Sequence, residues 1–130
     1  MRAMELGTPG EMRNRLNTLV LSGRKRATAM RARDYADDGE QMEQVGERLV
    51  LVDDAGARLA TIEVTAVDVR RFAEVTWEFA DAEGEGFTDA EDWRVRHRDF
   101  WNKFGEPVTD DTEIACIWFA IVDTPAAAGR

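Results

Sequence analysis

Residues 22–28, Ser-Gly-Arg-Lys-Arg-Ala-Thr, mark the point where the chain changes from a helical pattern to a strand-like one. Gly23 suits the left-handed residue that closes a helix. Lys25 and Thr28 then place an amine and a hydroxyl just past that stop. Positions three apart point to opposite faces of an extended chain, so the two side chains share a pocket only if a turn lies between them. A solvated basic loop is the alternative interpretation of the same residues.

An amphipathic helix is predicted over residues 9–22. Thr8-Pro9-Gly10-Glu11 has the form of a capping box, with Thr8 as the N-cap and Pro9 as the first helical residue. The apolar residues that follow recur at helical spacing and form one stripe: Met12, Leu16, Leu19 and Val20. The helix is therefore expected to pack one face on a core and to end at Gly23.

Four segments have the character of β-strands. They are Ala27–Arg31, Leu49–Val52, Arg58–Arg70 and Ile114–Val122. Asp53-Asp54-Ala55-Gly56 is typical of a hairpin turn between the second and third of them. The third strand is long and has one polar face expected to contact solvent, which suits a bent strand in a small barrel. The acidic stretch 34–47 carries two glycines and is predicted to be a loop.

Two further helices are predicted in the second half of the chain. A short one lies within residues 72–82, and a longer one begins at a second capping box, Thr88-Asp89-Ala90-Glu91. Gly105 and Pro107 end the longer helix. Its aromatic stripe is expected to face the barrel: Trp93, Phe100, Trp101 and Phe104. His97 shares the stripe and is interpreted either as a core histidine or as a ring that borders a cleft and stacks on a base.

The charge of the chain is unevenly distributed. The whole carries −9, but residues 1–33 hold eight Lys/Arg against two Glu, a net of +6, so the remainder carries −15. An acidic protein is poorly suited to a long polyanion, because phosphate neutralisation drives such binding. The basic third leaves room for a local phosphate contact, so we expect a small substrate or a short RNA as the partner, and not a DNA duplex. The sequence leaves the oligomeric state open.

The sequence also predicts the cellular compartment. No apolar run approaches the roughly 20 residues of a membrane span. Residues 1–5 lack the apolar centre of a signal peptide. Cys116 is the one cysteine, so no internal disulfide can form, in keeping with a reducing compartment. A cytoplasmic location without membrane attachment is the prediction.

Few residue types are available for catalysis. With one His and one Cys, a transition-metal cage is nearly excluded, and neither a nucleophile-elbow motif nor a Walker-type phosphate loop occurs. Lys, Thr, Glu, Asp and Tyr remain. Glu83 stands out because Gly84 and Gly86 follow it, and two glycines could let the backbone aim an acid into a pocket. An acidic surface loop is the alternative.

The order of these features resembles the ASCH family of the PUA-like superfold, over roughly residues 5–122. The pieces that carry the resemblance are Gly23-x-Lys25-x-x-Thr28, Tyr35, Val45-Gly46, residues 82–86 and Trp93-Arg94-x-x-His97-Arg98-x-Phe100. The resemblance implies an α+β fold in which a small β-barrel of mostly antiparallel strands carries helices packed at its openings. It further implies one ASCH domain over residues 1–123. The small residues of 124–130 predict a disordered tail.

The resemblance also implies an activity. Characterised relatives include a small bacterial amidohydrolase that removes the acetyl group from N4-acetylcytidine without a metal or other cofactor. Its motifs map the catalytic roles onto Lys25, Thr28 and Glu83, with Asp81 and Glu85 as alternative alignments of the acid. The expected substrate-binding residues are Arg24, Arg26, Arg31, Arg33, Tyr35 and His97. Arg33 replaces a Trp that many relatives have. Other relatives are regarded as RNA-binding modules or ribonucleases, which is the alternative function.

The protonation state of Lys25 decides its role, and the sequence leaves two possibilities open. If Glu83 touches Lys25, the lysine stays charged and serves as an electrostatic clamp on an oxyanion, while Glu83 acts as the base. If Arg24 or Arg26 lies closer, Lys25 could lose its proton and act as the base itself.

Overall fold

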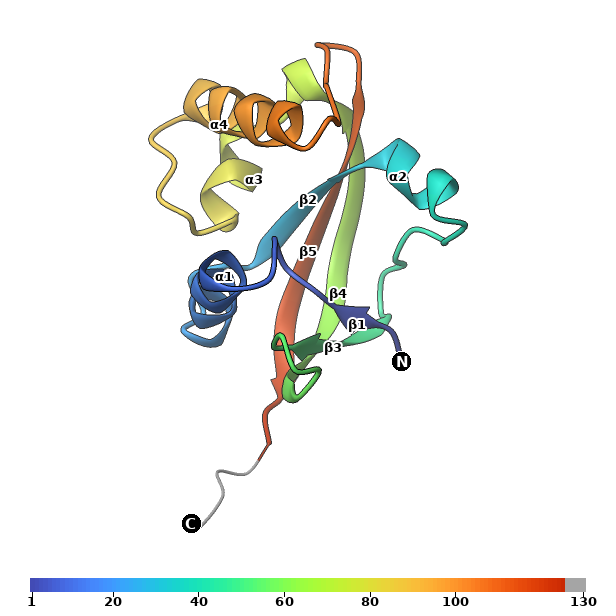
Figure 1. The fold of residues 1–130 in the computed structure, drawn as a ribbon, viewed down its shortest axis with the longest axis vertical. Helices are drawn as coiled ribbons and strands as arrows, with labels where there is room; N and C mark the ends of the chain where they lie inside the picture. Colours follow the sequence, from blue (N-terminus) through green and yellow to red (C-terminus); the bar gives the residue numbers. More distant parts are fainter. Residues whose placement is uncertain (126–130) are drawn as a thin grey trace.

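The computed structural model describes residues 1–125 and shows an α+β fold around one curved, mixed sheet (Figure 1). The strand order is β1-β3-β4-β5-β2. The strands are β1 (Ala3–Met4), β2 (Ala27–Arg31), β3 (Arg48–Val52), β4 (Arg58–Arg71) and β5 (Glu113–Asp123). The helices are α1 (Glu11–Leu21), α2 (Ala32–Asp37), α3 (Trp77–Ala82) and α4 (Ala90–Lys103), and a 3-10 turn covers Phe72–Glu74. Strand β1 runs parallel to β3, and the other pairings are antiparallel.

Strand β5 lies inside the sheet and is buried on both faces over much of its length. Its odd-numbered residues Ala115, Ile117 and Phe119 join a core cluster with α1, β1, β3 and β4. Its even-numbered residues Ile114 and Cys116 join a second cluster with α3 and α4. Because successive side chains of a strand point to opposite faces, one apolar strand can serve both clusters.

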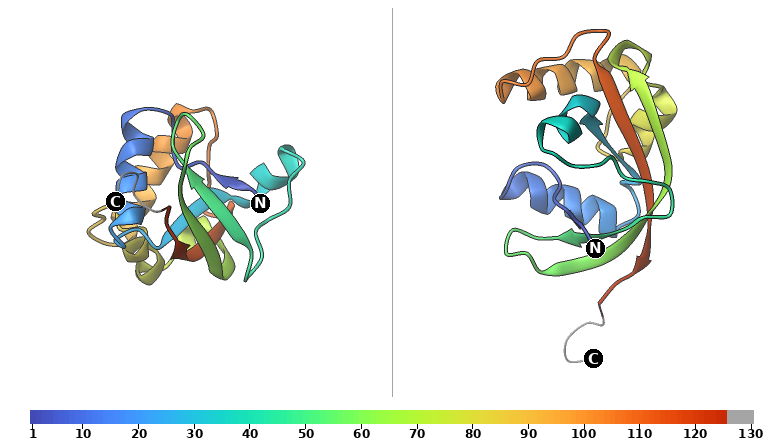
Figure 2. Two further views of the ribbon diagram at one scale, coloured as in Figure 1. Left: turned by 90° about the horizontal axis from the view of Figure 1, so that it is seen from below. Right: turned by 90° about the vertical axis from the view of Figure 1, so that its right-hand side faces the viewer.

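The sheet is not closed, so the predicted barrel is wrong in this respect. Strand β1 is two residues long and pairs with β3, and β2 pairs with β5; within residues 1–125 no ladder joins β1 to β2. A barrel requires continuous pairing around the ring. Here the long strands β4 and β5 bend instead, and Figure 2 shows α1 and α4 stacked beside the inside of that bend.

Helix α1 begins later than predicted, and the first capping box is wrong. The N-cap is Gly10, at φ 101°, which has no side chain to accept a capping hydrogen bond. The Thr8 hydroxyl lies 3.6 Å from the Met12 sulfur instead. The Gly10 N–H donates to Asp54 Oδ2 over 2.8 Å, so a carboxylate from the β3–β4 hairpin takes the place of a local cap.

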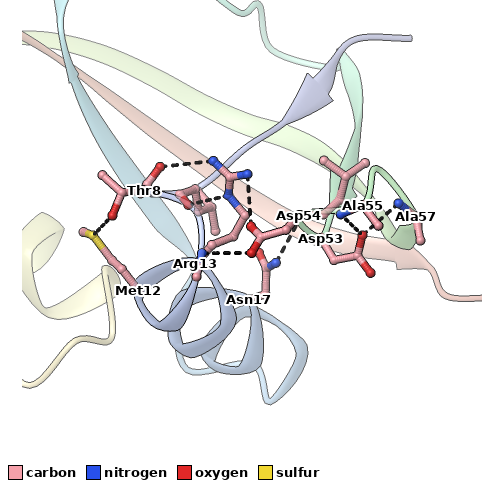
Figure 3. A network of polar contacts seen from close by, with 12 residues as sticks. Thr8, Met12, Arg13, Asn17, Asp53, Asp54, Ala55 and Ala57 are labelled. Atoms are coloured by element: carbon pink, nitrogen blue, oxygen red, sulfur yellow. Dashed lines mark hydrogen bonds and ion pairs between the residues drawn. The ribbon is translucent and has the colours of Figure 1, made fainter.

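Buried polar contacts fasten α1 to that hairpin (Figure 3). The Arg13 guanidinium donates to the carbonyl oxygens of Leu6 and Gly7 and to the Asp54 carboxylate. The Asn17 side chain donates to the Val52 carbonyl. These contacts fix the segment before α1 and thereby one wall of the site described below.

Other elements differ in detail from the prediction. The loop expected over 34–47 contains most of α2, and the helix expected within 72–82 splits into the 3-10 turn and α3, which Thr76 caps. The N-cap of α4 is Asp89, not Thr88. The strand β1 was not predicted. The tail expected over 124–130 lies, from residue 126 onward, outside the described residues.

The aromatic stripe of α4 is only partly buried. Trp93 and Trp101 lie in the core, Phe100 is half-buried, and Phe104 is 45% exposed. The prediction that the stripe largely faces the barrel is therefore wrong at Phe104, which lies at the C-cap just after the last residue of α4.

Candidate functional site

The turn after α1, the start of β2, the end of α3 and the middle of α4 enclose a hollow of about 230 Å³. Lys25, Thr28, Glu83 and His97 all line it, although they come from three separate segments of the chain. The remaining lining residues include Leu6, Met12, Arg15, Glu85, Phe87, Arg96, Phe100 and Trp101. The structure thus brings the three residues expected to be catalytic to one place.

Lys25 reaches the hollow because the chain turns immediately after α1. Gly23 closes the helix at φ 83°, and the Lys25 N–H donates to the Leu19 carbonyl. The Lys25 side chain is 2% exposed, and Nζ donates to Glu85 Oε2 over 2.8 Å. Thr28, half-buried on β2, lines the same hollow; the turn that precedes both residues lies at residues 22–23, before Lys25.

Glu83 is held at the C-terminal end of α3 and is 1% exposed. Its Oε2 accepts a hydrogen bond from the Trp93 indole N–H over 3.0 Å and lies 3.4 Å from His97 Nε2. Both contacts go to one oxygen, and within residues 1–125 no hydrogen bond reaches Oε1. That second oxygen remains available to accept a proton from water or from a substrate.

His97 is held between Trp93 and Glu83. Its Nδ1 lies 2.9 Å from the Trp93 carbonyl oxygen, which can only accept a hydrogen bond. Its Nε2 lies 3.4 Å from Glu83 Oε2. The ring also stacks on Trp93, with ring centroids 4.0 Å apart.

These neighbours keep Glu83 ionised despite its burial. Burial by itself raises the pKa of a carboxyl group, but the positive charges of Lys25 and His97 and the hydrogen bonds from His97 and Trp93 lower it more. The pKa of Glu83 consequently lies below its ordinary value of 4.5. Near neutral pH, Glu83 is a buried anion among donors, which is the state required of a general base.

Gly84 allows the loop after Glu83 to approach the turn that carries Lys25. It has φ +66°, and a Cβ atom at this position would lie 2.1 Å from the Arg24 carbonyl oxygen. The neighbouring Arg26 N–H donates to the Ala82 carbonyl over 2.7 Å. This close backbone contact positions Glu83 and Glu85 next to Lys25, so the glycine predicted to aim the acid has a definite steric role.

The expected substrate-binding residues are dispersed. Arg24 and Arg26 line a second hollow of about 400 Å³ together with Asp81, Gly84, Gly86 and Phe87. Arg31 is buried and forms ion pairs with Asp34 and Glu106. Arg33 is exposed and pairs with Asp37. Neither Arg31 nor Arg33 lines the hollow around Lys25.

Tyr35 belongs to a third hollow, of about 690 Å³, that adjoins the first through shared residues such as Thr28 and Trp101. Tyr35 is buried, and its hydroxyl donates to Glu43 over 3.2 Å. Burial and the Glu43 carboxylate raise the pKa of Tyr35 far above its ordinary value. The tyrosine is a neutral hydrogen-bond donor in the hollow that adjoins the first.

Sequence reasoning missed several residues of the site. Trp93 was assigned to packing alone, although its N–H holds Glu83. Arg15, Phe87 and Arg96 were not singled out. Trp93 and His97 are four residues apart on a capped helix and therefore share one face, so the sequence could have indicated that Trp93 lies at the site with His97. Glu85 was an alternative alignment of the acid, and the structure places both Glu83 and Glu85 at Lys25.

Residues 1–125 contain neither a cluster of metal-binding side chains nor a helix suited to span a membrane. No group of three or more His, Cys, Asp or Glu side chains in residues 1–125 is arranged to hold a metal ion. No helix within the same residues has the length and apolar character needed to cross a membrane.

The fold and the hollow define a PUA-like α+β domain with a polar site enclosed between its sheet and its helices. Comparison with known families is more specific. The chain belongs to the ASCH domain family, whose sequence pattern matches residues 2–123.

Solved structures agree with this assignment. The chain is similar to an ASCH domain from Lactobacillus crispatus JV V101, with 28% identity and a TM-score of 0.81 over 94% of this chain and 79% of that one. It is similar to protein EF3133 from Enterococcus faecalis V583, with 29% identity and a TM-score of 0.81 over 95% of this chain and 77% of that one. ZmASCH from Zymomonas mobilis, at 9% identity and a TM-score of 0.54 over 82% and 63%, shares the fold alone. None of the curated proteins matches the chain.

Proposed function

We propose that this protein is a metal-independent amidohydrolase that removes the acyl group from N4-acetylcytidine or a related N4-acylated cytosine nucleoside. Family membership is compatible with hydrolysis or with RNA binding. The observation that favours hydrolysis is the convergence of Lys25, Thr28 and Glu83 on one hollow, with Lys25 and Glu83 almost fully buried. Acyl transfer needs a nucleophile or positioned water, a base and an oxyanion stabiliser, and these three side chains can supply them.

The reaction would begin with Glu83 as base. Oε1 of Glu83 takes a proton from the Thr28 hydroxyl or from a water molecule, and that oxygen attacks the acetyl carbonyl carbon. The C=O π electrons move onto oxygen, and the resulting oxyanion is stabilised by Lys25. The carbonyl then re-forms as the C–N bond breaks, and Glu83 returns the proton to N4 of cytosine. If water was the nucleophile, acetate and cytidine are released directly. If Thr28 attacked, cytidine leaves first and Glu83 then activates a water molecule that hydrolyses the acetyl-threonine ester, which releases acetate and restores the hydroxyl.

Lys25 is better suited to the clamp than to the base. Its nearest ionic partner is Glu85, at 2.8 Å, and the buried Glu83 carboxylate lines the same hollow. Arg24 and Arg26 line the second hollow instead. Two carboxylates near an amine favour its charged form, and a charged amine stabilises an oxyanion but cannot accept a proton.

Incubation with N4-acetylcytidine in the presence of a chelator tests this proposal. We expect cytidine to appear, followed by its ultraviolet spectrum and by chromatography, at a rate that excess EDTA leaves unchanged. Loss of all release after chelation, restored by an added metal, would contradict metal independence. A cytoplasmic location belongs to this proposal and is tested by fractionation of the native host.

An RNA-binding module, or a ribonuclease that uses the same lysine, is the second candidate. The exposed Arg24 and Arg26 favour it, since guanidinium groups bind phosphate. Micromolar binding of RNA at physiological salt, without release of cytidine from any N4-acyl cytidine, would support the module. RNA cleavage that persists through rigorous purification would support the nuclease.

A further inference from the structure

Most positive charges in this acidic chain are neutralised locally, and the exceptions lie together. Eleven Lys and Arg side chains form ion pairs with carboxylates. Arg98 and Lys103 lie over aromatic rings. In the described residues the three remaining cations are Arg15, Arg24 and Arg26, which all lie on or next to α1 and beside the candidate site.

Arg24 and Arg26 point away from the reaction hollow toward the second one. Arg24 and Arg26 are exposed, whereas Lys25 between them is buried. Accordingly, Lys25 lines the first hollow, whereas both arginines line the second, of about 400 Å³. One carboxylate, Asp81, lines it as well, so the local balance stays positive.

The loop between the two hollows adds backbone donors. The N–H groups of Glu85, Gly86 and Phe87 make no hydrogen bond to any acceptor within residues 1–125. Gly86, at φ 87°, lines the second hollow, and Phe87 lines both. Successive free N–H groups in a glycine-containing turn are a common anion-binding element.

We infer that the second hollow binds the phosphate group of a nucleotide, held by Arg24, Arg26 and the N–H groups of the 85–87 loop. Arginine suits this ligand because its planar guanidinium donates two parallel hydrogen bonds to phosphate oxygens. The pairing of this phosphate with a cytosine base in the first hollow rests on the proposed function; the phosphate site itself does not. The preferred substrate is then an N4-acylated cytosine nucleotide, and not the uncharged nucleoside.

The first experiment tests the phosphate site without the reaction. Inorganic phosphate is titrated into the ¹⁵N-labelled protein, and the amide resonances are followed by NMR. We expect saturable shifts at residues 85–87 that weaken as the salt concentration rises. An Arg24→Gln/Arg26→Gln double variant should lose them. The control is Arg48→Gln/Arg70→Gln, which removes the same charge from two exposed, ion-paired sites on β3 and β4. Absence of saturable shifts, or an equal loss in the control, would overturn the site whether or not the protein is a hydrolase.

The second experiment links the two hollows. We expect 5′-CMP to bind about tenfold tighter than cytidine by calorimetry, the gain from one charge-assisted hydrogen bond, and the double variant to abolish this difference. A further gain with a cytidine trinucleotide would identify an internal RNA phosphate as the ligand, whereas equal affinity would identify a terminal monoester. Equal binding of CMP and cytidine would overturn the link. Hydrolysis of N4-acetylcytidine under the same conditions reports separately on the proposed reaction.

Discussion

Glu83 shows how a buried carboxylate can be kept charged by its neighbours. An ionised group inside a protein is tolerated only where ion pairs and hydrogen bonds replace water. Here the Trp93 N–H and the His97 ring occupy Oε2, and the Lys25 charge lies in the same hollow. Within residues 1–125 the arrangement leaves Oε1 without a protein partner, as a base requires.

Replacement of Trp93 by Phe should raise the pKa of Glu83, because the ring volume is largely kept while the N–H donor is lost. The shift is upward because the lost N–H donor stabilises only the ionised form of the carboxyl group. A base works only when ionised, so the acid limb of kcat/KM should lie below pH 4.5 in the wild type and move upward in W93F. The control is Trp118→Phe, since the Trp118 ring packs on Phe79 and makes no N–H hydrogen bond within residues 1–125. An unmoved acid limb in W93F would contradict the positioning role.

The same lowered pKa bears on stability. A carboxyl group whose pKa is lower in the folded state stabilises the fold fully above its unfolded value, here 4.5, and this contribution disappears as the pH falls through the folded-state value. The stability difference between W93F and the wild type that comes from Glu83 should therefore be full above about pH 5 and should shrink as the pH falls further.

Thr28 distinguishes two nucleophiles. If its hydroxyl attacks, Thr28→Ser should keep measurable turnover, while Thr28→Ala should lose roughly 10²-fold or more, as for loss of a reacting group. If water attacks, Thr28→Ala should retain most activity. The readout is the steady-state rate with N4-acetylcytidine, with melting temperatures as the control for folding. Equal activity of both variants would remove Thr28 from the chemistry.

At the scale of elements, the site depends on how closely the α3–α4 loop approaches the α1–β2 turn. Gly84→Ala should cost about 2–5 kcal/mol, from a left-handed φ and from overpacking against the Arg24 carbonyl. Gly56→Ala is a matched control. Gly56 has φ +81°, but an added Cβ atom would meet no described atom beyond its chain neighbours within 4 Å, so the substitution should cost only about 1–2 kcal/mol. Chemical unfolding measures both. Equal losses would show that the close contact does not position the loop.

The two ends of the α4 stripe should behave differently. Trp101 is 6% exposed and Phe104 is 45% exposed. Trp101→Ala should cost about 3–5 kcal/mol, the range for a buried aromatic residue. Phe104→Ala should cost less than about 1 kcal/mol. Similar midpoint shifts in urea would mean that the last turn of α4 is packed in solution, for instance against another molecule.

Short-range sequence patterns correctly predicted the helix ends and the hairpin turn. Gly23 closes α1, the Asp53–Gly56 turn joins β3 to β4, and Pro107 follows α4. The start of α1 could not be predicted, because its cap is the Asp54 carboxylate, 44 residues away. Strand β1 could not be predicted either, because two residues are too few to show a periodic pattern. The strand forms only because it pairs with β3, more than 40 residues later.

At the scale of the whole molecule, the convergence of Lys25, Thr28 and Glu83 was predictable only with the help of the family resemblance. Residues 25 and 83 are brought together by the packing of one loop on another, which no sequence period encodes. Arg31 shows the limit: its position in sequence suggested substrate, yet Asp34 and Glu106 neutralise it in the fold. The open sheet was missed because strand patterns do not reveal whether two edges meet.

The central claim is that Glu83 is the base of an amide hydrolysis, with Lys25 as the charged clamp. The most direct measurement is the rate of cytidine release from N4-acetylcytidine by the wild type, Glu83→Gln and Lys25→Ala, each shown by circular dichroism to be folded. Asp111→Asn, at an exposed surface ion pair, is the control. We expect both site variants to lose about 10²–10⁴ in rate, the usual contribution of a general base, and the control to match the wild type. A folded Glu83→Gln that retains wild-type turnover, or a wild type that releases no cytidine above background, would contradict the account.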